Sequence, residues 1–257
     1  MSKQLNTHLI RISEKDVQNT YCCMTESPTP WQEALCYCRT WVLDNLGTFV
    51  DGYHLQLEDG VIIGHLYYAD SEQALFPYDV ESGAVVIYCE WIQERYQRQG
   101  FGKVMFAGFL DEMKRKGKQG ILVETTDIEG QMYFKHYISR GFNIIREEGH
   151  QKLLYYPISE DEIRIQSRKS LVSVHKRFPV EVLVFRGFLC PYEVSTYLLL
   201  QEIAPEFGEQ IVIKEIWISP ETLQEYGVAS GILINGKLKL TGGESESAVR
   251  QAIREEL

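Results

Sequence analysis

The feature that most constrains this chain is a pair of glycines at the point where an apolar strand is followed by a helix. Residues 84–92 form an apolar run that predicts a strand, and residues 103–110 carry apolar side chains at helical spacing. Gly100 and Gly102 lie between the two elements. A helix start leaves backbone N–H groups unpaired and carries partial positive charge, and glycine lets that backbone approach an anion closely. The junction therefore predicts a site for a phosphate or a pyrophosphate.

This junction resembles the acetyl-CoA motif of the GNAT superfamily of N-acetyltransferases, in which Gln or Arg is followed by two residues, Gly, one residue, and Gly or Ala. Ile92, eight residues before Gly100, matches the apolar residue that ends the fourth strand of the family. Further along, Tyr137 precedes Gly141 and Phe142 as a helical tyrosine does in the family. The competing interpretation is an αβ turn that needs glycine for its shape alone. Two matches in the correct order favour the GNAT resemblance.

The resemblance implies acetyl-CoA as the co-substrate and assigns roles to site residues. Backbone groups of Trp91 and Ile92 would hold the pantetheine arm, and the N–H of Ile92 would stabilise the oxyanion. The residues expected to bind the pyrophosphate are Gln97, Arg98, Gln99, Gly100, Phe101, Gly102 and Lys103. Tyr137 would assist the departing coenzyme A. Because tyrosine has an ordinary pKa of about 10 and a thiol one of about 8.5, complete proton transfer is uphill by about 2 kcal/mol, which favours a hydrogen bond.

The general base is left open. A primary amine with a pKa near ~10.4 is protonated at neutral pH, so a group of the protein or a water must take a proton. Glu90 shares a predicted strand face with Tyr88 and Ile92 by period two, near the expected position of the thioester. Glu124, on the next predicted strand, is the second candidate, and either carboxylate is also consistent with an ordinary polar residue at a sheet rim. His65 is expected to be structural.

The order of predicted elements indicates an α/β (α+β) first domain over residues 1–158. The expected strands cover residues 8–12, 53–57, 61–68, 84–92, 121–123, 142–146 and 152–156, and the expected longer helices begin near residues 30, 102 and 132. The GNAT resemblance covers roughly residues 5–158. It implies a mixed sheet whose fourth and fifth strands splay apart, with the pantetheine arm in the gap.

Residues 159–178 are polar and are expected to be a linker, and the pattern restarts as β-α-β-α-β-β-α over residues 179–257. This second part resembles a small thioredoxin-like domain with Cys190 at the redox position, and the two-part arrangement is similar to bacterial YoaP-like proteins. Glu193 stands where a second cysteine is expected, and its charge opposes thiolate formation. We therefore expect a module that covers the substrate or forms a homodimer more than a redox centre at Cys190.

A net charge of −10 over 257 residues disfavours a nucleic-acid partner and weakly favours cationic substrates. The first residues lack an apolar signal core and no run approaches the ~18 apolar residues of a membrane span, so a cytoplasmic protein without a membrane partner is expected. Six cysteines are then expected as thiols. Cys22, Cys23, Cys36 and Cys38 suggest zinc, but such close neighbours diverge on strands and helices, so no metal is expected.

The main prediction is thus an N-acetyltransferase that acts on a primary amine of a small molecule or peptide. Two other classes stay open: a coenzyme A sensor without turnover, because the base is uncertain, and a redox-coupled scaffold that uses Cys190. The sequence does not distinguish a polyamine, an aminoglycoside, an amino acid or a peptide as the acceptor.

Overall fold

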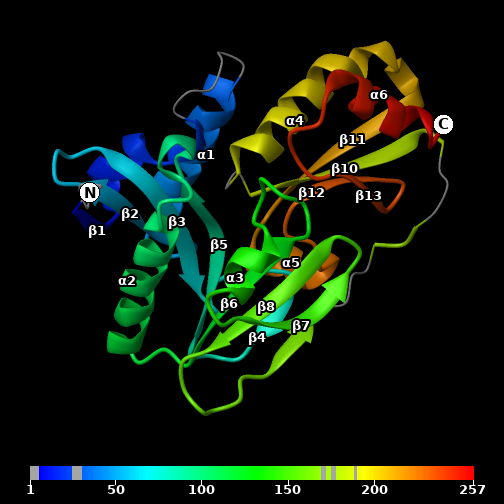
Figure 1. Cartoon of the computed structure of the whole chain (residues 1–257). Helices are drawn as coiled ribbons and strands as arrows, with labels where there is room; N and C mark the ends of the chain where they lie inside the picture. The colour runs from blue at the N-terminus through cyan, green and yellow to red at the C-terminus, as the bar shows by residue number, and fades with distance from the viewer. Residues whose placement is uncertain (1–5, 25–30, 169–171, 175–177, 188–189) are drawn as a thin grey trace. The chain divides into compact units, whose positions relative to one another are not determined.

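The computed structural model describes residues 6–24, 31–168, 172–174, 178–187 and 190–257, and its chain separates into two compact units (Figure 1). The first unit holds Met1–Thr25, Asn45–Ala74 and Val80–Ile165, and the second holds Glu26–Asp44, Leu75–Asp79 and Gln166–Leu257. The segment expected as a linker contains a short strand, β9 (Ile165–Ser167), which pairs with β4 (Tyr78–Val80). The second unit therefore draws on two stretches from the first half of the chain, which the predicted boundary at residue 158 did not foresee.

The first unit is built on a seven-stranded mixed sheet with the strand order β1-β2-β3-β5-β6-β8-β7. Its strands are β1 (Thr7–Arg11), β2 (Asp51–Leu57), β3 (Ile62–Asp70), β5 (Ala84–Ile92), β6 (Gly120–Thr126), β7 (Asn143–Glu148) and β8 (Gln151–Pro157). Its helices are α2 (Phe101–Arg115) and α3 (Phe134–Ile138), with short 3-10 turns η1 (Glu14–Asn19), η2 (Cys22–Met24) and η3 (Glu94–Tyr96). Only the pair β5 and β6 is parallel among the recorded ladders of this sheet. The predicted mixed α/β architecture is confirmed.

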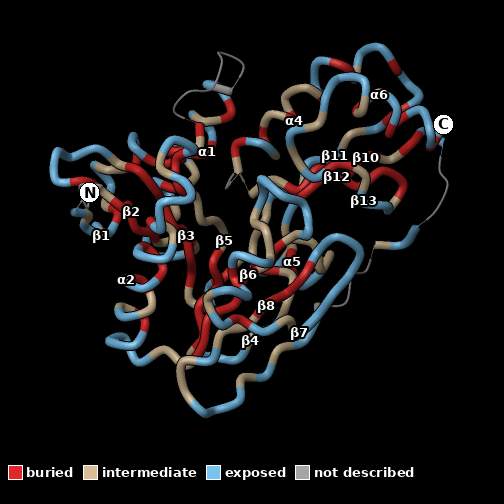
Figure 2. The backbone as a smooth tube through the Cα atoms, in the orientation of Figure 1, coloured by how far each residue is buried: buried red, intermediate tan, exposed pale blue. Residues whose placement is uncertain are grey.

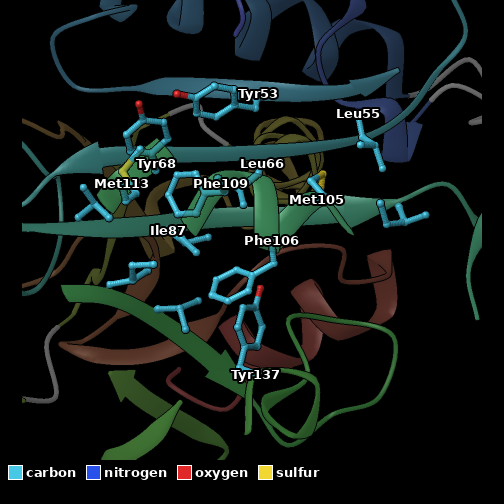
Figure 3. Packing of buried hydrophobic residues seen from close by; sticks show 14 of the residues in the cluster. Tyr53, Leu55, Leu66, Tyr68, Ile87, Met105, Phe106, Phe109, Met113 and Tyr137 are labelled. Atoms are coloured by element: carbon cyan, nitrogen blue, oxygen red, sulfur yellow. The ribbon is translucent and has the colours of Figure 1, made fainter. Parts of the chain in front are cut away.

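Helix α2 covers one face of this sheet because its apolar residues recur at helical spacing. Met105, Phe109 and Met113, each four residues apart, are fully buried against Leu66 and Ile87 (Figure 3). Burial follows the central strands of the sheet, whereas the turn that leads from β5 to α2 is exposed (Figure 2). The core thus fixes the helix, whereas the turn before the helix is exposed, as are Lys103 and Val104 in its first helical turn.

The parallel strands β5 and β6 separate part-way along their length. Their recorded pairing begins at Ala84 with Gly120 and ends at Ile87 with Val123, although β5 continues to Ile92. The register of β5 against β3 shifts at the same point, where Tyr88 is an extra residue in β5. Such a bulge increases the local twist of a strand and interrupts the alternation of its faces. The splayed strands implied by the resemblance are present in the described part of the chain.

The second unit contains the predicted order β-α-β-α-β-β-α, and its four strands are arranged as β11-β10-β12-β13. The elements are β10 (Val180–Arg186), α4 (Pro191–Ile203), β11 (Ile211–Trp217), α5 (Pro220–Tyr226), β12 (Gly231–Ile234), β13 (Lys237–Leu240) and α6 (Glu246–Arg254), with turns η4 (Ala204–Glu206) and η5 (Gly208–Gln210). Helix α1 (Trp31–Asn45) is grouped with this unit except for its last residue. Over the described ranges, no helix has the length and apolar character needed to cross a membrane.

Candidate functional site

The turn between β5 and α2 has the backbone shape that the two glycines predict. Gly100 caps the helix with a φ of 90°, a conformation that favours glycine, and open space surrounds the position of a Cβ there. Arg98 also has a positive φ, of 59°. Gly102 has a different reason, because a Cβ there would lie 3.0 Å from a guanidinium nitrogen of Arg140. Gly100 therefore gives the turn its backbone shape, whereas Gly102 leaves room for the side chain of Arg140.

Side chains of the motif tie the turn to its surroundings. Gln97 donates a hydrogen bond from its amide to the carbonyl of Ile92 at 2.8 Å, and Gln99 donates to the carbonyl of Arg95 at 2.9 Å. Phe101 is buried in the core next to the ring of Tyr96. These contacts hold the turn in place without a ligand.

The first helical turn contains backbone donors that are not used within the helix. Lys103 and Val104 donate to the carbonyl of Gly100, at 3.0 and 3.2 Å. Phe101 and Gly102 precede the first intrahelical bonds, so their N–H groups have no carbonyl partner within the helix. The side chains of Arg98 and Lys103 are exposed beside these donors. The combination suits a phosphate or pyrophosphate, as predicted from the sequence.

Beyond the bulge, backbone groups of β5 point alternately to β3 and to the edge that β6 has left. Gln93 donates its N–H to Ile63 next to β3, and the carbonyl of Trp91 also lies on that side, close to Gly64. By strand alternation, the N–H groups of Glu90 and Ile92 point to the open edge. The N–H groups of Ile92 and Glu90 are therefore the backbone donors available to a ligand along this edge. The backbone of Trp91 belongs to the ladder with β3.

Glu90 forms a buried ion pair rather than standing free. Its carboxylate accepts a hydrogen bond from Arg140 at 2.6 Å, and only 5% of the Glu90 side chain and 12% of the Arg140 side chain are exposed. Strict alternation along the strand predicted that Tyr88 and Glu90 share a face. Because Tyr88 is the extra residue of the bulge, Ile87 and Glu90 share a face instead, and both lie on the side of α2. The guanidinium also lies 5.3 Å from the Phe106 ring centroid. A carboxylate held in this way is a poor general base.

Tyr137 lies next to this ion pair, with the Arg140 guanidinium 5.2 Å from its ring centroid. It is almost fully buried in the hydrophobic cluster that includes Phe106 (Figure 3). Burial, followed by the nearby charge of Glu90, raises the pKa of the Tyr137 hydroxyl well above its ordinary value. The hydroxyl donates a hydrogen bond to the sulfur of Met132 at 3.3 Å. Such a group keeps its proton and acts as a hydrogen-bond donor. Arg140, three residues later, was missed by sequence reasoning, although its helical spacing from Tyr137 was a usable signal.

Glu124 lies on β6 one residue beyond the last pairing with β5. Burial, and then the charge of Glu148, raise the pKa of the Glu124 carboxyl to about 7. Its neighbour Val123 packs in the core beneath α2, so the side chain of Glu124 is on the opposite face of the sheet from Tyr137. A carboxyl with this pKa exchanges a proton readily near neutral pH. Between the two predicted base candidates, the surroundings favour Glu124 over Glu90.

Two other sequence candidates have surroundings of a different kind. His65 is fully buried between the sulfurs of Cys22 and Cys89, at 3.3 and 3.4 Å from its two ring nitrogens, and burial lowers its pKa to about 3. These contacts fit a neutral structural histidine.

Cys190 is the half-buried N-cap of α4, with Glu193 in the first turn. Among the residues that the structure describes, no group of three or more side chains is arranged to hold a metal ion.

Comparisons with known proteins find likeness at the level of architecture. No family model matches the sequence, and no curated protein matches it. The ribosomal-protein-S18-alanine N-acetyltransferase from Escherichia coli shares 17% identity over 61% of this chain and 97% of its own, with a TM-score of 0.45. The GNAT-family N-acetyltransferase YhbS from Escherichia coli in complex with CoA shares 15% identity over 63% of this chain and 86% of its own, with a TM-score of 0.46. The PaiA N-acetyltransferase from Thermoplasma acidophilum in complex with coenzyme A shares 11% identity over 60% of this chain and 99% of its own, with a TM-score of 0.42. The chemistry of the site rests on its own residues.

Proposed function

We propose that this chain is an acetyl-CoA-dependent N-acetyltransferase that acts on a primary amine. The observation that carries the proposal is the separation of the parallel strands β5 and β6 after Ile87 and Val123, on the strand that leads through η3 to the glycine turn at the start of α2. The edges of two strands thus accompany a helix start whose first amides have no partner within the helix. This arrangement fits a long donor with a diphosphate at one end and an extended polar arm.

The donor is proposed to bind from the turn inward. Its diphosphate is held by the N–H groups of Phe101 and Gly102, with charge from Arg98 and Lys103. Its pantetheine arm lies along the open edge of β5. The N–H of Ile92 is proposed to bind the thioester carbonyl, because a backbone donor there stabilises the oxyanion as it forms.

The proton-transfer groups lie on opposite faces of the sheet, on either side of the proposed arm. Glu124 takes a proton from the ammonium of the acceptor, directly or through a water, and the free amine attacks the thioester carbonyl. The tetrahedral intermediate then collapses, the C–S bond breaks, and the amide is released. Tyr137 donates a hydrogen bond to the departing thiolate, which takes its proton from the attacking nitrogen.

The acceptor is proposed to be a cationic amine of a small molecule or a peptide in the cytoplasm. A net charge of −10 favours the approach of such a molecule. The second unit is proposed to be a thioredoxin-like module that covers the acceptor or forms a homodimer, with no required role for the Cys190 thiol.

The test is to follow thiol release from acetyl-CoA with a panel of amines, and to measure coenzyme A binding separately by calorimetry. Turnover that is lost in Glu124→Gln but kept in Glu148→Gln supports the proposal, since Glu148 only tunes the neighbouring carboxyl. Binding without turnover for any amine supports a coenzyme A sensor. Absence of binding by both acetyl-CoA and coenzyme A contradicts the proposed site.

A further inference from the structure

The space where β5 and β6 separate is bridged by the chain itself, through the returning segment, residues 131–133. The N–H of Thr126 on β6 donates to the carbonyl of Met132 at 2.9 Å, and Thr126 also forms a parallel bridge with Tyr133. On the other side, the N–H of Glu90 on β5 donates to the sulfur of Met132 at 3.3 Å. One residue thus contacts the facing edges of both strands.

The sulfur of Met132 has a second donor, the hydroxyl of Tyr137, also at 3.3 Å. A thioether sulfur is a weak acceptor, and two hydrogen-bond donors on one methionine are more than core packing requires. Under the proposed function, these two donors face the sulfur end of the acyl donor. The Met132 side chain therefore places a sulfur where the thioester sulfur of the donor belongs.

The chain next to the returning segment is suited to movement. Residues 127–131 are all exposed, and Gly130 has a φ of 88° with open space around it. Met132 itself is only partly buried at the border of the core. Besides this packing against the core, Met132 is held by one backbone hydrogen bond from Thr126 and by two weak hydrogen bonds to its sulfur. The loss of these hydrogen bonds is offset when a ligand offers acceptors to the same donors, which are the N–H groups of Thr126 and Glu90 and the hydroxyl of Tyr137.

We propose that Met132 is a removable occupant of the donor site, so that the acyl-CoA arm binds only as the returning segment leaves the gap between β5 and β6. This inference rests on the proposed function. It makes Met132 a residue that sets donor affinity and the room available for the acyl group. A smaller side chain at this position is expected to favour donors with longer acyl chains.

The direct test is NMR of protein labelled with ¹³C at the methionine methyl groups. The chain has five methionines, so the spectrum is simple, and Met132→Leu assigns the signal of interest. Saturating coenzyme A is expected to shift the Met132 signal to the position of a solvent-exposed methyl, while the core residues Met105 and Met113 stay unchanged. In Met132→Ala, the Kd of coenzyme A is expected to fall about tenfold, the value of two weak hydrogen bonds that no longer compete. Met113→Leu, a core change, is the matched control and should leave the Kd unchanged.

The outcomes separate this inference from the proposed function. If coenzyme A binds the wild-type protein while the Met132 signal stays in place, or if Met132→Ala leaves the Kd unchanged, the inference is wrong and the donor site stands. If neither the wild-type protein nor Met132→Ala binds coenzyme A, the donor site itself is wrong and the inference is overturned with it. Binding by Met132→Ala alone supports both.

Discussion

Replacing Glu124 with glutamine is expected to remove one pH-dependent contribution to the stability of the first unit. The pKa of the Glu124 carboxyl rises from its usual 4.5 to about 7 in the folded chain. Between these values the folded chain binds more protons at this group than the unfolded chain, so the free energy of unfolding falls as the pH rises. This stabilisation is fully present below about pH 4.5 and is lost as the pH rises through about 7. It amounts to about 3 kcal/mol, since each pH unit of separation is worth about 1.4 kcal/mol.

The assay is urea unfolding of the wild-type protein and Glu124→Gln at pH 5 and pH 8, read from NMR amide signals of β6. Amide signals are needed because a chain with two compact units need not unfold in one step. His54 and His65, whose pKa values are lowered by burial to about 4 and about 3, stabilise the protein as the pH rises, but they act equally in both proteins. An equal change of stability between pH 5 and pH 8 in both proteins would refute the reasoning.

Three further substitutions test the site. Tyr137→Phe is expected to lower kcat by about 10²-fold in a thiol-release assay while the Kd of acetyl-CoA changes little, and unchanged turnover would remove Tyr137 from the mechanism. Glu90→Gln leaves the Arg140 guanidinium buried beside a neutral group and is expected to cost about 3–5 kcal/mol in urea unfolding; a loss below 1 kcal/mol would contradict a buried ion pair. Gly100→Ala, at a φ of 90°, is expected to cost about 1–2 kcal/mol and to weaken acetyl-CoA binding in calorimetry. Gly117→Ala, at a φ of 69° beyond the other end of α2, is the matched control and should keep binding intact.

The parts of the fold that depend on local pattern were predictable from the sequence. The strand over residues 84–92, the glycine turn and the helix that follows are each specified by neighbouring residues, and all lie where the sequence indicated. The alternation of β-α-β-α-β-β-α in the second unit was equally local. What depends on pairing between distant segments was not predictable, such as the grouping of residues 26–44 and 75–79 with the second unit.

The candidate site shows the same division. The bulge at Tyr88 arises from the register with β3, and period two alone cannot reveal it. Residues 132–140 carry a helical pattern, but α3 begins at Phe134, because the carbonyl of Met132 accepts the N–H of Thr126 at an edge that has lost its neighbour. Glu124 was a candidate from its place on the predicted strand that follows residues 84–92, whereas the raised pKa of its carboxyl depends on tertiary burial.

The extra residue in β5 determines which chemistry the sheet offers on each of its sides. If Tyr88 were instead a regular member of the ladder, strict alternation would carry the thiol of Cys89 toward α2 and the carboxylate of Glu90 away from Arg140. Deletion of Tyr88 would keep Glu90 on the side of α2, because the ladder already pairs Ile87 with Tyr68 and Cys89 with Tyr67. The chemistry on each side of the sheet thus depends on one residue that stays outside the ladder.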